Sequence, residues 1–195
     1  IRAEGPLPAI AAANLSAVRV LHGGGPHAPG VPVEIATGVV EVRGSGVTAM
    51  NPDLEWYVRR GCQTMGYTLP ERQVLDLLNG IELMRGLDHI GQIAVFGRGE
   101  AAVHAIYAAL ADEAIAEVVL EAPPVTHTDP ATPELPSVLR VGDLPHNLAL
   151  LFPRPITFVG EVPEAYQWTV DLYEKLGRAD RIRVIEKIAD WEPLP

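Results

Sequence analysis

The small residues between Gly97 and Ala102 point to a site of chemistry where a strand turns into a helix. The apolar run before Gly97 predicts the strand, and the alanine-rich run after Glu100 predicts the helix. In a nucleophile elbow, G-x-S-x-G, small flanking residues let the backbone turn sharply, so that the central serine projects from the sheet edge beside free helix N–H groups. Here the central residue is Gly99, which has no side chain. The segment therefore predicts an elbow without a nucleophile.

The same turn also satisfies the dinucleotide fingerprint G-x-G-x-x-G/A. Its positions are Gly97, Gly99 and Ala102. Glu121 ends the next predicted strand, where an acidic residue would bind a ribose hydroxyl. This fingerprint normally opens the first strand–helix unit of a sheet, whereas here at least two strands and a helix come earlier. A nucleotide-binding module is therefore kept as an alternative, and simple tight packing of a strand against a helix is another.

A second glycine-rich turn, His22–Gly25, follows a short apolar strand predicted over residues 17–21. Successive glycines leave backbone N–H groups free to point into a cleft, which is how half of an oxyanion hole is built. A flexible surface turn is the simpler interpretation of these glycines. The residues expected to line the ligand edge are His22, Gly23, Gly24, Gly25, Gly97, Arg98 and Glu100.

The elements that must position these turns alternate between strand and helix along most of the chain. Strands are predicted over 17–21, 38–43, 92–96, 117–120, 156–159 and 181–186, and helices over 70–85, 99–111, 144–151 and 163–176. Such alternation predicts a three-layer α/β/α fold around a mainly parallel sheet of about six strands. Ligands of such sheets bind beyond the carboxyl ends of the strands. We expect an N-terminal arm over 1–16 and one domain over 17–195.

Composition limits the classes of partner. The chain has 195 residues, of which 48% are hydrophobic and 21% charged, so it can bury a substantial core. Its formal net charge is −10, and no run of lysine and arginine occurs. This argues against nucleic acid and against anionic membranes. A small neutral or cationic ligand, or a protein, suits the charge better.

Cysteine and histidine spacing predicts neither a disulfide nor a bound metal. Cys62 is the single cysteine, and its simplest role is that of a small buried apolar residue. The histidines lack the H-x-x-x-H spacing of a helical metal site, and no cofactor is expected. No apolar run reaches the ~20 residues that span a bilayer, and the start lacks the charged-then-apolar order of a signal peptide. No compartment is predicted, and the chain is expected to be processed or a fragment.

The order of motifs resembles α/β-hydrolases of the acetyl xylan esterase and prolyl-oligopeptidase-like kind. The motifs are HGGGP, VVEVRGSG, ERQVLDLLNGIEL and IAVFGRGEAA, followed by the approach to Ile156 through Phe152-Pro153-Arg154-Pro155. In those relatives RGxG follows the fourth strand, the elbow follows the fifth, and PRP leads into the seventh. The resemblance spans roughly residues 17–186 and implies a truncated α/β-hydrolase connectivity.

The resemblance also implies where the catalytic acid and histidine should lie, and the chain departs from the pattern at both places. The turn after the seventh strand offers Glu161 instead of aspartate, and no histidine occurs in 187–195. Substitutes are conceivable: Ser45 in the RGSG turn, Cys62, or Ser137 paired with a loop histidine such as His127.

The leading hypothesis is therefore an esterase-like domain without a recognisable Ser-His-acid triad. Such a domain would be catalytically inactive and would serve binding, or contact with another domain or subunit. A carboxylic-ester hydrolase with relocated catalytic residues is the first alternative, and a dinucleotide-binding module is the second. The expected partners are a small-molecule ester or carbohydrate, or a protein partner or missing N-terminal domain.

Overall fold

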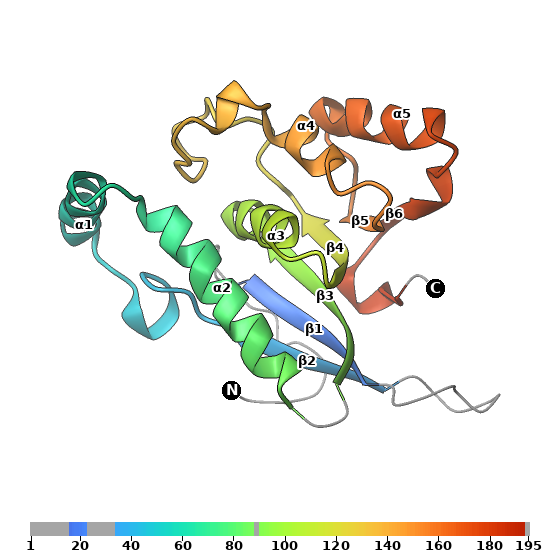
Figure 1. The fold of residues 1–195 in the computed structure, drawn as a ribbon, viewed down its shortest axis with the longest axis horizontal. Coiled ribbons are helices and arrows are strands. Elements are labelled where there is room, and N and C mark those ends of the chain that lie inside the picture. Colours follow the sequence, from blue (N-terminus) through green and yellow to red (C-terminus); the bar gives the residue numbers. More distant parts are fainter. Residues whose placement is uncertain (1–15, 23–33, 88–89, 194–195) are drawn as a thin grey trace.

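The computed structural model describes residues 16–22, 34–87 and 90–193, and these form one mixed α/β unit (Figure 1). The strands are β1 (Ser16–His22), β2 (Glu34–Val40), β3 (Ile90–Arg98), β4 (Ile115–Glu121), β5 (Ile156–Val159) and β6 (Ile182–Ile185). The α-helices are α1 (Pro52–Thr64), α2 (Leu69–Arg85), α3 (Glu100–Ala111), α4 (Leu144–Ala149) and α5 (Gln167–Lys175). Short 3-10 helices are η1 (Gly46–Thr48), η2 (Val138–Arg140), η3 (Glu164–Tyr166), η4 (Ala179–Arg181) and η5 (Ile188–Asp190).

The six strands form one sheet in the order β2-β1-β3-β4-β5-β6. Strands β3 to β6 are parallel, and each connection between them contains a helix. Parallel neighbours require such crossovers, because the chain must return to the same edge of the sheet before the next strand begins. The predicted α/β class with a mainly parallel sheet is confirmed.

Strand β1 departs from the predicted direction. It runs antiparallel to both neighbours, and its register pairs Ser16 with Gly97 and His22 with Ile90. Residues 23–33, which separate β1 from β2, are rich in glycine and proline and shorter than the dozen or more residues of a usual parallel crossover. An antiparallel pairing suits so short a connection. The expectation that β1 ends at the ligand edge is therefore wrong.

Helices α2 to α5 cover one face of the sheet. Val95 and Leu120 project from the strands into a core that Leu77 of α2, Ile106 of α3 and Leu148 of α4 complete. Alternate strand residues point to opposite faces of a sheet, so this face takes every second apolar residue of β3, β4 and β5. Figure 1 shows α2 and α3 in front of the strands, α4 and α5 along the top of the view, and α1 to one side.

The second face carries a smaller core, which the C-terminal segment covers. Phe96 and Val119 lie in this core with Trp191, whose ring is buried. Glu117 is also buried here and accepts hydrogen bonds from Thr157 Oγ1 at 2.6 Å and from Trp191 Nε1 at 2.9 Å. Within the described residues, the 3-10 helix η5 is the only helix whose residues join this core, so the third layer of the fold is thin.

Local sequence signals account for the start of α2. The Thr68 hydroxyl accepts the N–H of Glu71, while the Glu71 carboxylate accepts the N–H of Thr68 at 2.7 Å. This reciprocal capping box satisfies two of the N–H groups that the first helical turn leaves unpaired. The helix predicted over 70–85 is confirmed, with one extra residue at its start.

Helix α1 was not predicted, although its start carries a recognisable signal. Asn51 caps the helix by accepting the N–H of Leu54, and Pro52 occupies the first helical position. Cys62 is the one buried residue of the helix, so no continuous apolar stripe marks it in the sequence. None of the described helices is both long enough and apolar enough to cross a bilayer.

Candidate functional site

The turn between β3 and α3 has the sharp geometry that the motif predicts. Gly99 adopts φ +57° and ψ −129°, a conformation that residues with a side chain rarely adopt. Its N–H donates to the Glu121 carbonyl at 2.9 Å, and its own carbonyl accepts the N–H of Ala102 at 3.0 Å. These bonds tie the turn both to β4 and to the first turn of α3. The chain thus passes abruptly from strand to helix at Gly99, with no side chain at its apex.

Gly97 and Ala102 are explained by packing alone. A Cβ atom on Gly97 would lie 2.3 Å from the Ala101 carbonyl oxygen and 2.6 Å from the Ala102 Cα. Those neighbours are backbone atoms, so they cannot move aside without shifting the helix. Ala102 itself is completely buried against the sheet. The close approach of β3 and α3 therefore requires small residues here, whatever the turn binds.

Arg98 and Glu121 form an ion pair across the ends of β3 and β4. Their side-chain atoms Nη2 and Oε2 lie 2.7 Å apart, and the two residues are directly opposite each other in the parallel register. The dinucleotide alternative assigns the Glu121 carboxylate to a ribose hydroxyl. In the structure that carboxylate is instead engaged by the arginine of the same turn.

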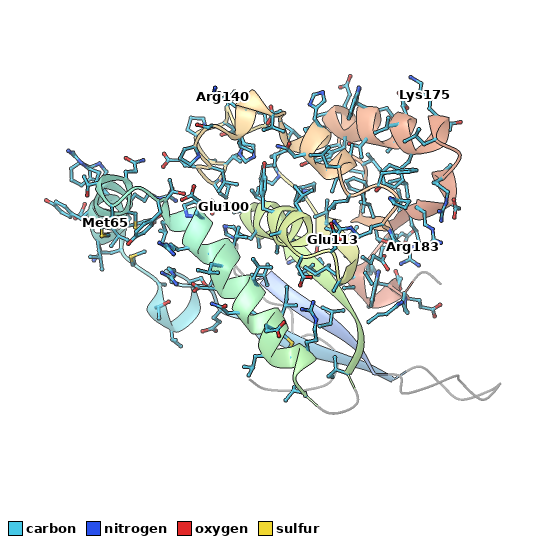
Figure 2. All side chains as sticks on the ribbon, viewed as in Figure 1. Met65, Glu100, Glu113, Arg140, Lys175 and Arg183 are labelled. Carbon is cyan, nitrogen blue, oxygen red and sulfur yellow. The ribbon has the colours of Figure 1, made fainter. Side chains whose placement is uncertain are left out.

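Glu100 begins α3, and its side chain lies near charged groups of α1 (Figure 2). Burial raises the pKa of its carboxyl group, Arg59 opposes that increase, and Glu55 adds to it. Arg59 also pairs with Glu55 at 2.8 Å and approaches Glu134 at 4.0 Å. The start of α3 is thus bordered by a mixed-charge cluster from α1 and residue 134. Sequence analysis missed Arg59, although its i, i+4 spacing from Glu55 is a recognisable helix pattern.

Ser45 is at the expected edge of the sheet, but its hydroxyl serves the turn. Val40 and Gly97 both pair with Ser16, so the turn after β2 and the turn after β3 lie at the same edge. Ser45 is 3% exposed, and its Oγ donates to the Val42 carbonyl at 2.6 Å. A buried hydroxyl committed to a backbone carbonyl is poorly placed to attack a ligand.

We expected the His22–Gly25 turn to face Gly99. His22, the residue of that turn that the structure describes, lies instead at the opposite end of β3. His22 pairs with Ile90 at the start of β3, whereas Gly99 follows the end of that strand. The two ends of β3 are roughly 25 Å apart at the usual rise of a strand. The antiparallel direction of β1 is the cause. Gly23, Gly24 and Gly25 lie outside the described residues.

The fold is also found in a protein of known structure. No model of a known protein family matches the chain, and no curated protein matches it. The chain is similar to the crystal structure of a candidate acetyl xylan esterase from Bacteroides fragilis, with a TM-score of 0.63 and 17% sequence identity. The similarity covers 82% of this chain but 48% of that one, so this chain spans about half of its neighbour's length. The chain has a truncated α/β-hydrolase-like fold.

The sequence resemblance predicts a catalytic acid in the turn after β5. Glu161 is there, after Gly160 with φ +91°, and its side chain is exposed. The segment after β6 contains η5 and the buried Trp191 but no histidine. At the three positions that the sequence resemblance predicts for a triad, the chain has Gly99, the exposed Glu161 and, in residues 186–195, no histidine. In the part of the chain that the structure describes, no cluster of three or more metal-ligating side chains occurs.

The histidines with described side chains lie elsewhere. His104 is on α3, one turn after Glu100, and is 4% exposed. Burial lowers its pKa to about 4, and neither ring nitrogen has a hydrogen-bond partner among the described residues. His146, on α4, is exposed and lies beside the Trp168 ring.

His127 belongs to a polar network that sequence analysis did not assemble. Its Nε2 lies 2.7 Å from the Tyr107 hydroxyl, which also accepts a hydrogen bond from Asn147 Nδ2 at 2.9 Å. Burial lowers the pKa of His127 and raises the pKa of Tyr107 to about 12. The direction of the hydrogen bond between the phenol and His127 depends on the tautomer of the histidine ring. No local motif links these residues, which come from α3, the 123–143 segment and α4.

Proposed function

We propose that this chain is a non-catalytic α/β-hydrolase-type domain that serves binding or contact with another domain or subunit. The observation that carries the proposal is Gly99, where the sharp nucleophile turn is kept but the side chain is absent. Nucleophilic catalysis requires the nucleophile together with the base that activates it. The exposure of Glu161 supports the same conclusion, as does the absence of a histidine from residues 186–195.

Two kinds of partner fit this proposal. A small ester or carbohydrate would occupy the ligand edge of the sheet, as in other sheets of this type. A protein or a further domain is supported by the span of the chain, which is about half of the similar esterase-like structure. In either case we propose that the domain recognises its partner without chemical turnover.

Replacing Gly99 with serine tests which roles have been lost. We expect Gly99→Ser to show no hydrolysis of p-nitrophenyl acetate, because serine without a base is a weak nucleophile at neutral pH. The variant should also lose about 1–2 kcal/mol of unfolding free energy, because φ +57° with ψ −129° is strained for any residue with a Cβ atom. Turnover and urea denaturation measure the two effects.

Gly99→Ala is the matched control, since it has the same backbone strain and no hydroxyl group. Both variants should be destabilised to a similar extent, and both should be inactive. If Gly99→Ser hydrolysed the ester while Gly99→Ala did not, a base would have to lie within reach of residue 99. That result would reject the proposal that the whole triad has been lost.

One observation favours the alternative of a hydrolase with relocated catalytic residues. Ser137 and His127 line the same cavity of about 230 Å³, with Glu134 beside them. His127 Nε2, however, faces the Tyr107 hydroxyl and not a serine. A fluorophosphonate probe separates the two proposals. Labelling that Ser137→Ala removes would establish the relocated enzyme, and an unlabelled protein would exclude it.

A further inference from the structure

Two neighbouring cavities share the segment Leu135–Ser137 as a common wall. The larger has a volume of about 410 Å³ and lies between α2, α3 and the segment from Leu135 to Val141. The smaller is the cavity of about 230 Å³ that contains His127 and Ser137. The larger, called here the α2–α3 cavity, falls in the 300–1,000 Å³ range of small-molecule sites. Gly97, Gly99 and Glu121 are absent from its lining, so it is separate from the turn after β3.

Hydrogen bonds hold the walls of the α2–α3 cavity in place. Tyr107 is fixed at its hydroxyl by both His127 and Asn147. The Thr68 hydroxyl donates to the Glu134 carbonyl at 2.9 Å, which fastens the 134–141 segment to the start of α2. A cavity whose walls are already fixed loses little conformational freedom when a ligand enters, which favours binding.

The lining of the α2–α3 cavity is mainly apolar. Its apolar wall comes mainly from Val74, Leu135, Val138 and Val141. These side chains favour a hydrocarbon or aromatic body, since burying such a body removes apolar surface from water.

Two further residues of the lining, Tyr107 and Glu71, carry an aromatic ring and a carboxylate, which are the kinds of group that stabilise an ammonium ion. Glu71 Oε2 accepts the Thr68 N–H, which holds the carboxylate in a fixed place. None of the eight residues that line this cavity is an arginine, a lysine or a histidine.

We propose that the α2–α3 cavity binds a cationic amphiphile, an amine with an aromatic or alkyl body, through Glu71 and the Tyr107 ring. This inference rests on the proposed binding function and adds to it a site and a class of ligand. The net charge of −10 favours the approach of cations over anions of the same size. The nearby Glu134 carboxylate, in the adjoining cavity, acts in the same direction.

Three compounds with one phenylalkyl body and different ends test the proposal by isothermal titration calorimetry. They are 4-phenylbutylamine, 4-phenylbutan-1-ol and 4-phenylbutyrate. The amine should bind about tenfold more tightly than the carboxylate, with the alcohol between them, because only the charge at one end changes. Equal affinities, tighter binding of the carboxylate, or no binding of the amine would each overturn the inference.

Glu71→Gln is the decisive variant, because glutamine at this position preserves the capping box and hence the start of α2. We expect it to weaken binding of the amine roughly fivefold and to leave binding of the alcohol unchanged. Glu82→Gln is the matched control. It removes the same charge from the same helix, at an exposed residue outside the cavity, and should leave both affinities unchanged. Equal loss of amine binding in both variants would show that overall charge, not this site, is responsible.

The inference and the proposed function can fail separately. Ester hydrolysis by the wild-type protein would reject the non-catalytic function whatever the amine does. Absence of amine binding from a protein that also shows no turnover would reject the α2–α3 cavity as an amine site and leave the non-catalytic function in place.

Discussion

Replacing Arg183 with methionine is expected to lower the free energy of unfolding by about 3 kcal/mol. Arg183 Nη2 lies 3.2 Å from the carboxylate of Glu117, which is 3% exposed on the second face of the sheet. Removing the cation breaks a buried ion pair, which typically costs about 3–5 kcal/mol. The hydrogen bonds from Thr157 and Trp191 remain, so the lower end of that range applies. Urea denaturation at pH 7 measures the change.

Arg178→Met is the matched control for this prediction. Arg178 also pairs with a carboxylate, but its partner Asp180 is 62% exposed. Exposed pairs contribute about 0–1 kcal/mol, so the control should be nearly as stable as the wild type. In the double variant Arg183→Met with Glu117→Gln, much of the lost stability should return, because glutamine carries no charge and its amide oxygen can still accept from Thr157 and Trp191. A loss for Arg183→Met no larger than for Arg178→Met would contradict the assigned role of Glu117.

The second large effect is a loss of stability in mild acid that originates at His104. Burial lowers the pKa of this histidine in the folded protein to about 4, against 6.5 for an unperturbed side chain. Above pH 6.5 the ring is neutral in both the folded and the unfolded states. As the pH falls below 6.5, the unfolded chain takes up the proton first, so folding becomes less favourable until the pH reaches about 4. Between pH 8 and pH 5 this amounts to about 2 kcal/mol.

His104→Leu should abolish this part of the pH dependence. Because neither ring nitrogen has a hydrogen-bond partner among the described residues, an apolar side chain of similar volume should cost little at pH 8. At pH 5 the variant should be the more stable of the two proteins. His146→Gln, at an exposed histidine on α4, should keep the wild-type profile. Parallel stability curves for wild type and His104→Leu from pH 8 to pH 5 would refute the prediction.

The parallel strands of the sheet could be predicted from the sequence because they contain short, mainly apolar runs. Residues 156–159 form β5 at the predicted bounds, and the run over 92–96 lies inside β3. Buried on both faces, such strands appear as short, continuous apolar runs. The direction of β1 carries no such signal, because its apolar run is equally compatible with parallel and antiparallel neighbours. The length of the connection to β2 was the available clue.

The sequence predicted the candidate site only at the turn after β3, where a local motif determines the backbone conformation. Gly97 and Gly99 form the expected turn because a sharp strand-to-helix passage needs small residues at fixed spacing. The contact of Arg59 with Glu134 depends on which segments pack together, and no local pattern records that. The same holds for Tyr107 and His127, which meet across 20 residues of chain. Contacts between side chains of different helices, strands and loops can be identified only from the three-dimensional structure.

Steady-state hydrolysis of p-nitrophenyl acetate by the purified wild-type protein tests the central claim most directly. With glycine at position 99 and no histidine in residues 186–195, we expect the rate to equal that of the same protein after heat denaturation. Saturable turnover above that background, abolished by substitution of one residue, would show that the domain is an enzyme and contradict the account.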